Sequence, residues 1–154
     1  MPFQLTSPAF RDGHRIPDRH TGEGEDVSPA LRWSGAPDGT RSFVLSVDDP
    51  DAPNGPFGHW AVFGIPADWH ELPEAFDGGD ADGVRFGRND AGGSGYSGPC
   101  PPRGHGVHHY RFRLAAIDRP TLDLDAGASV RDVEAEARRH SLDVAELVGL
   151  YDRK

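Results

Sequence analysis

Lysine, cysteine and long apolar runs are all scarce in this chain of 154 residues, and each scarcity excludes a class of protein. Lys154 is the only lysine and Cys100 the only cysteine, so neither an intramolecular disulfide framework nor a cysteine-based zinc module can form. No window approaches the roughly 18 apolar residues of a transmembrane helix. The N-terminus lacks the charged and then apolar pattern of a signal peptide. We therefore expect a cytoplasmic protein.

The charge is strongly one-sided. There are 25 Asp and Glu against 16 Lys and Arg, and the formal net charge is −9. Such a field repels phosphate backbones and anionic lipid surfaces, so we expect no nucleic-acid partner and no stable membrane association. The acid excess, with Arg in place of Lys, is a halophile-like composition, although a GC-rich genome also depletes lysine. A single small anion held by local donors is compatible with this charge.

Apolar residues are few, but they follow a regular pattern along the sequence. Leu, Val, Phe and Ile together make up 31 residues, about 20% of the chain, while Gly and Pro contribute 20 and 14. The apolar residues gather in short runs that turn residues bound, which is the pattern of a mainly β domain. No linker divides the chain, so we predict one domain over 1–154.

The individual runs predict the elements. Strands are expected at 41–49, 59–65 and 107–117, with weaker ones at 3–10 and 84–88 and Gly/Pro/Asp-rich connectors at 17–30, 50–58, 66–83 and 89–106. A helix is predicted at 130–139, because Ser129 can cap its first turn. A second short helix is predicted at 142–148, ended by Gly149. The expected architecture is a β-sandwich or barrel-like sheet with this helical pair packed at one end.

Strand alternation brings ionisable residues together. Asp49 ends an apolar face formed by Phe43, Leu45 and Val47. His59 shares a face with Ala61, Phe63 and Ile65, and His108 shares one with Tyr110, Phe112 and Leu114. Antiparallel pairing places Asp49 and His59 at one rim of the sheet, and His108 follows the long connector 89–106. The sequence thus predicts a pocket where these three groups converge.

Two connectors adjoin this predicted pocket. Segment 49–53 (DPDAP) is stiff, because two prolines fix φ and the aspartates can cap their own following amides. Segment 92–104 is rich in glycine, so successive N–H groups can form an anion-binding concavity. Cys100 lies between prolines and is expected to be structural.

Metal and nucleophile patterns are weaker. Strand phase separates His108 from His109, so a metal site shared with His105 is not expected. Asp49, His59 and His108 could ligate zinc as two His and a carboxylate, but no metal-binding helix motif supports this. We predict no metal and no cofactor, and no serine lies in a nucleophile elbow.

Several motifs in order now resemble one family. They are Phe10-Arg11-Asp12-Gly13, Ser28-Pro29-Ala30-Leu31-Arg32-Trp33, Asp49-Pro50-Asp51-Ala52-Pro53, Gly58-His59-Trp60, Gly95-Tyr96-Ser97-Gly98-Pro99-Cys100-Pro101-Pro102 and His108-His109-Tyr110. The chain resembles the phosphatidylethanolamine-binding protein family, in its bacterial and archaeal Raf-kinase-inhibitor-like branch, over nearly its whole length.

The resemblance implies a β-sandwich of two antiparallel sheets with a small pocket for phosphate-like anions at one end. The family's ligand-binding residues carry over to Asp49, Asp51, His59, Gly98, Pro101, His108 and Tyr110. A homodimer is also suggested. Raf inhibition belongs to particular animal relatives and is not transferred.

Three classes of function follow. We predict a non-enzymatic protein that binds a small anion or phosphorylated ligand and modulates a kinase or another phosphoprotein. The first alternative is a hydrolase that uses Asp49, His59 and His108. The second is a protein-interaction or protease-inhibitor scaffold with a vestigial pocket. Because imidazoles bind anions when protonated, anion affinity is expected to rise as pH falls through the histidine range.

Overall fold

A computed structural model describes residues 2–78, 83–125 and 127–153, and its strands form two sheets. The small sheet has the order β1-β3-β6 and is antiparallel. The large sheet has the order β2-β9-β8-β4-β5-β7, and only its β2–β9 pair is parallel. The strands are β1 (Gln4–Thr6), β2 (His14–Arg15), β3 (Leu31–Ser34), β4 (Ser42–Asp49), β5 (Phe57–Pro66), β6 (Glu71–Leu72), β7 (Arg85–Phe86), β8 (His108–Ile117) and β9 (Ser141–Tyr151).

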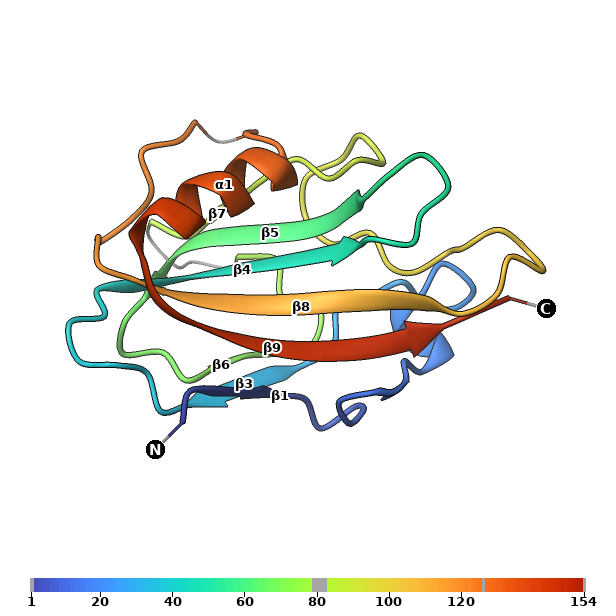
Figure 1. Cartoon of the computed structure of the whole chain (residues 1–154), viewed down its shortest axis with the longest axis horizontal. Helices are drawn as coiled ribbons and strands as arrows, with labels where there is room; N and C mark the ends of the chain where they lie inside the picture. The colour runs from blue at the N-terminus through green and yellow to red at the C-terminus, as the bar shows by residue number, and fades with distance from the viewer. Residues whose placement is uncertain (1, 79–82, 126, 154) are drawn as a thin grey trace.

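Two apolar layers hold these elements together, and Figure 1 shows the strands and the helix that bound them. The larger layer lies between the sheets and contains Leu5, Trp33, Phe43, Phe112 and Leu147 among its buried residues. The smaller layer lies on the opposite face of the large sheet, beneath the only helix in the described part of the chain, α1 (Val130–His140). The predicted sandwich is therefore confirmed, and the lean apolar fraction suffices because β4 and β5 are buried on both faces.

The predicted strands at 41–49, 59–65 and 107–117 are present as β4, β5 and β8, and the weaker ones shorten to β1 and β7. The sequence patterns gave no sign of β2, β3, β6 or the 3-10 turn Asp18–His20. Connector 66–83 contains β6, and its residues 79–82 lie outside the described residues. No described helix is long and apolar enough to cross a membrane.

The predicted C-terminal helical pair is half right. The Ser129 hydroxyl caps α1 by accepting from the Asp132 N–H at 3.1 Å, as expected. The second helix, 142–148, is wrong, because the chain passes at Ser141 directly into β9, which pairs with the whole length of β8. Ala, Glu and Leu favour helix locally, but every second residue from Ala145 to Tyr151 is buried, so packing against the sheet overrides that preference.

Gly149 is a second place where packing against the sheet outweighs a local preference. It was expected to end a helix, but it lies inside β9, where a Cβ atom would stand 2.4 Å from Ile16 Cγ1. Glycine here lets the β2 segment approach β9 closely. The lack of a side chain at Gly149 therefore allows close packing of the sheet and does not end a helix.

The predicted face of β5 is also wrong, and this error concerns the site. Trp60 pairs with Val47, but the next pair joins Gly58 to Asp48, so His59 is an extra residue in the strand. Such a β-bulge reverses the alternation beyond it. His59 consequently lies on the face of Trp60, whereas Ala61 and Phe63 pack against α1.

Candidate functional site

The three residues predicted to converge do line one cavity. Because β4 runs antiparallel to β5 and β8, the end of β4 at Asp49 meets the starts of the other two strands near His59 and His108. The cavity has a volume of about 240 Å³. Its other walls come from the connectors, and the lining residues are Asp49, Ala52, Phe57, His59, Ala91, Ser97, Gly98, Cys100, Pro101, Pro102, His108 and Tyr110.

His108 is locked between two partners. Its Nδ1 lies 2.6 Å from Asp49 Oδ2, and its Nε2 lies 2.6 Å from His105 Nδ1. Asp49 also accepts the Asp51 N–H at 2.8 Å, through its other oxygen. Both Asp49 and His108 are almost fully buried, so this chain of hydrogen bonds fixes the ring of His108 and leaves neither of its nitrogens free.

His59 differs from His108 in having one free nitrogen. Its Nδ1 lies 2.6 Å from the Ser97 carbonyl and must therefore carry a proton to donate. No partner for Nε2 is found among the described residues. The ring is only 6% exposed, and this burial lowers the pKa of His59 below its usual 6.5 despite the opposing effects of the Ser97 carbonyl and nearby carboxylates. Neutral His59 offers a lone pair at Nε2.

Tyr110 contributes a hydroxyl that stays protonated. Burial first, and then the charge of Asp49, raise the pKa of Tyr110 far above its usual value, and Asp49 is also its hydrogen-bond partner. The Tyr110 ring packs edge-on to His59, with their centroids 5.2 Å apart. The Tyr110 hydroxyl can therefore donate a hydrogen bond, and the Tyr110 ring keeps the His59 ring in place.

Asp51 is placed differently from the other predicted ligand residues. It does not line the cavity, because its carboxylate turns to the surface and accepts from both the N–H and the Nδ1 of His109, each at 2.8 Å. Partial burial opposes the effect, but these hydrogen bonds lower the pKa of Asp51. Its direct contribution to the site is the backbone N–H that holds Asp49.

The glycine-rich loop supplies fewer amides than its composition suggested. The Ser97 N–H bonds the His59 carbonyl, and the Gly98 N–H bonds Asp26 Oδ1 at 2.7 Å. Proline at 99, 101 and 102 removes three further donors. In the segment 97–102 the Cys100 N–H is thus the one backbone donor without a partner in the described structure. Gly98 and Pro101 line the cavity, but neither presents an N–H to it.

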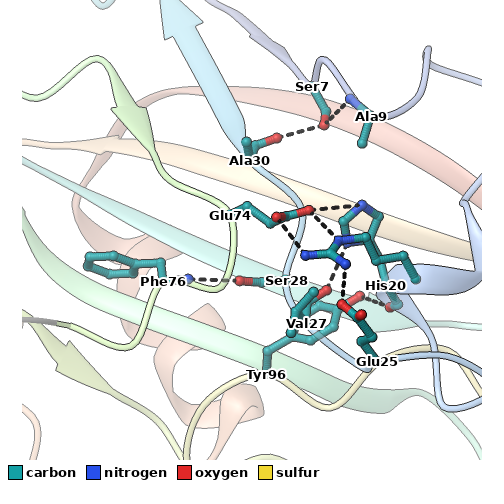
Figure 2. Close-up of polar contacts among 11 residues, drawn as sticks. Ser7, Ala9, His20, Glu25, Val27, Ser28, Ala30, Glu74, Phe76 and Tyr96 are labelled. Atoms are coloured by element: carbon teal, nitrogen blue, oxygen red, sulfur yellow. Dashed lines mark hydrogen bonds and ion pairs between the residues drawn. The ribbon is translucent and has the colours of Figure 1, made fainter.

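Segment 17–30 supports this loop from behind. The Tyr96 hydroxyl donates to the His20 carbonyl at 2.6 Å, as Figure 2 shows, and the Gly22 N–H donates to the Pro99 carbonyl at 2.9 Å. Segment 17–30 is itself tied to Glu74, which bonds Arg19 at 2.8 Å. Asp26 completes the support from a left-handed conformation, φ 57°, which is uncommon for a residue other than glycine.

Sequence reasoning missed Asp26 and His105 as parts of the site. Asp26 lies in a connector where no periodic pattern marks a facing residue. The spacing of His105 from His108 suggests only a metal ligand, whereas in the structure His105 is a hydrogen-bond partner of His108. Cys100 is a free, exposed cysteine that lines the cavity, and its side chain also packs beside Gly22; its structural role stays a prediction.

Replacing Gly98 by Ala is expected to destabilise the fold by about 2 kcal/mol, the usual cost of overpacking. A Cβ atom there would lie 2.4 Å from both Asp26 Oδ1 and the His20 carbonyl oxygen, so the two segments must separate. Gly93→Ala is the matched control, since its Cβ would meet nothing nearer than 3.8 Å. Thermal unfolding measures both, and equal melting temperatures would contradict the prediction.

Comparison with known proteins identifies the family. The family model described as phosphatidylethanolamine-binding protein matches residues 6–152. The chain belongs to this family.

Three relatives match over most of their own length. A protein of Aquifex aeolicus designated UPF0098 is 46% identical over 152 residues, which is 98% of this chain and 89% of the relative. The protein YbhB of Escherichia coli, which carries the same designation, is 40% identical over 97% of this chain and 99% of its own length. The crystal structure of Escherichia coli YbcL, described as a member of the mammalian PEBP family, is 36% identical over the whole of both chains, with a TM-score of 0.94.

Proposed function

We propose that this protein binds small phosphate-type anions in the cavity at the end of β4, β5 and β8, and performs no chemistry on them. The observation that carries the proposal is that two residues lining one cavity, His59 and Cys100, each keep a group without a partner in the described structure, Nε2 and the backbone N–H. A protonated imidazole and a backbone amide are the donors that a phosphate oxygen accepts from. The family description, which names a phospholipid ligand, supports the same ligand class.

The size and charge of the cavity limit which ligands can bind in it. A volume of about 240 Å³ accommodates a phosphorylated headgroup but not two acyl chains. Asp49 is the only carboxylate among the lining residues of the described structure, so it offers an ammonium group one counter-charge. A phosphorylethanolamine group meets both requirements, and a phosphorylated side chain of a kinase or another phosphoprotein would present the same phosphate.

The hydrolase alternative lacks geometric support. The Asp49–His108 pair resembles a general base and the carboxylate that orients it. For catalysis, however, His108 Nε2 would need to face a nucleophile or a water, and it faces the ring of His105 at 2.6 Å. A binding role needs no such nucleophile, and it agrees with the buried position of both groups.

The test is a calorimetric titration of phosphorylethanolamine at pH 6 into the wild type and His59→Gln. We expect the variant to bind at least about tenfold more weakly, the effect of losing one hydrogen bond to a charged group. His109→Gln is the matched control, because His109 is a surface residue outside the cavity, and it should bind like the wild type.

A second variant guards against misfolding of the first. Ala91 is exposed and lines the cavity rim, so Ala91→Trp should obstruct entry with little effect on the fold. Undiminished affinity in both His59→Gln and Ala91→Trp would overturn the proposal.

A further inference from the structure

Cys100 is a thiol set into the wall of the anion cavity. It is free and exposed, and it lies among the lining residues beside Pro101. Its Cβ and Sγ pack beside Gly22, where an added Cβ atom would stand 3.1 Å from each of them. Prolines on both sides stiffen its backbone, and a bond from the Gly22 N–H holds the neighbouring Pro99 carbonyl. The thiol is thus kept at a fixed point of the cavity.

A second observation, independent of the thiol, indicates that a ligand occupies the space in front of it. His59 is 6% exposed, lines the same cavity and has a free Nε2 among the described residues. The backbone N–H of Cys100 is a free donor, and His59 Nε2 becomes a second one when a bound anion favours the protonated ring. An anionic group bound by these two donors would therefore lie next to the Cys100 sulfur.

From this juxtaposition we infer that Cys100 is a modification site for small disulfides that carry an anionic group, and that its modification closes the cavity to phosphate-type ligands. The inference rests on the proposed function, since the same donors hold the anionic part of the disulfide. Ligand binding is then under redox control, because a mixed disulfide at Cys100 fills the space that the ligand needs.

The reaction is thiol–disulfide exchange. The Cys100 thiol loses its proton to solvent, and the thiolate attacks one sulfur of the disulfide. A new S–S bond joins Cys100 to one half of the reagent as the original S–S bond breaks. The other half leaves as a thiolate, so Cys100 is oxidised and the leaving half is reduced. A second thiol reverses the step and reopens the cavity.

The charge of the whole protein makes the inference testable. With a net charge of −9, an ordinary surface thiol should react fastest with a cationic disulfide and slowest with an anionic one. A thiol beside an anion site should show the reverse order. Three reagents of similar size separate these cases: dithiodiglycolate, which is anionic, 2-hydroxyethyl disulfide, which is neutral, and cystamine, which is cationic.

The experiment measures the rate of mixed-disulfide formation at pH 7 by intact-protein mass spectrometry. The control is Ser94→Cys in a Cys100→Ser background, because Ser94 is an exposed residue of the same loop that does not line the cavity. We expect the ratio of dithiodiglycolate to neutral rates to be about tenfold higher at Cys100 than at the control. Inorganic phosphate should slow the reaction at Cys100 only, and phosphorylethanolamine should no longer bind to the modified protein.

The outcomes separate this inference from the proposed function. If phosphorylethanolamine binds the unmodified protein but cystamine reacts fastest and phosphate gives no protection, the thiol site is refuted and the binding function stands. If Cys100 favours the anionic reagent but neither phosphate nor phosphorylethanolamine binds, the function fails and a thiol site for anionic disulfides remains. If the modified protein binds phosphorylethanolamine with unchanged affinity, modification of Cys100 does not close the cavity and that part of the inference is refuted.

Discussion

Sulfate should bind more tightly as the pH falls, by up to about tenfold per pH unit, and the affinity should level off at a pH below 6.5. The reason is the state of His59. Burial favours its neutral form and lowers its pKa in the empty cavity, whereas a bound anion favours the imidazolium and raises that pKa. Binding therefore takes up one proton between the two values. Below the lower value His59 is already protonated, so the dependence ends there.

Sulfate is chosen because its own charge is constant over this range, so the slope reports only on the protein. Calorimetry in two buffers with different ionisation heats gives the proton uptake directly. His59→Gln should abolish the slope, while His109→Gln should retain it, since His109 bonds Asp51 outside the cavity. A slope that persists in His59→Gln would show that another group takes up the proton.

Glu134→Gln should stabilise the protein at pH 8 by on the order of 2 kcal/mol, allowing for solvent on one side of the carboxyl group. Glu134 lies on α1 beside a second cavity of about 220 Å³, and its Oε2 is buried without a partner. Burial first, and then the charge of Asp48, raise the pKa of Glu134 from 4.5 to about 7. Asp48 is itself held by Arg111 at 2.8 and 3.0 Å, and the opposing charge of Arg113 offsets only part of the shift at Glu134.

The direction of the pH dependence follows from this shift. The folded state holds the proton on Glu134 more tightly than the unfolded state does, so this stabilisation is fully present below pH 4.5 and is lost as the pH rises to about 7. A glutamine keeps the shape without the charge. Urea unfolding at pH 4.5 and pH 8 should show the gain at pH 8 only. Glu136→Gln, on the same helix but paired with His140 at 3.1 Å, is the control and should change stability by less than about 0.5 kcal/mol.

Local patterns were sufficient where one physical cause dominates. Alternation in β4 and β8 correctly placed Asp49, His108 and Tyr110 on one face, because a single period governs each strand. The cap at Ser129 was correct because it depends on atoms three residues apart. For His59 the prediction reached the right neighbours for a wrong reason, since the face was reversed by a bulge that no residue pattern announces.

Segments far apart in the sequence decided the rest. The amides of segment 92–104 were expected to face an anion, but the amide of Gly98 is taken by Asp26, a residue 72 positions away. The strand β9 was expected to be a helix, because its local composition favours helix and its pairing with β8 cannot be seen in the segment alone. Both errors arise where a contact distant in sequence outweighs a local preference.

The composition thus settled that the protein is acidic and has no intramolecular disulfide, its short apolar runs indicated a mainly β domain, and its motifs indicated the family. These properties depend on composition and on neighbouring residues, so the sequence alone determined them. Which donors remain free in the cavity was decided only by the tertiary structure. A donor is free only when no other segment has used it, as Asp26 uses the Gly98 amide and His105 uses His108, and that accounting requires the whole fold.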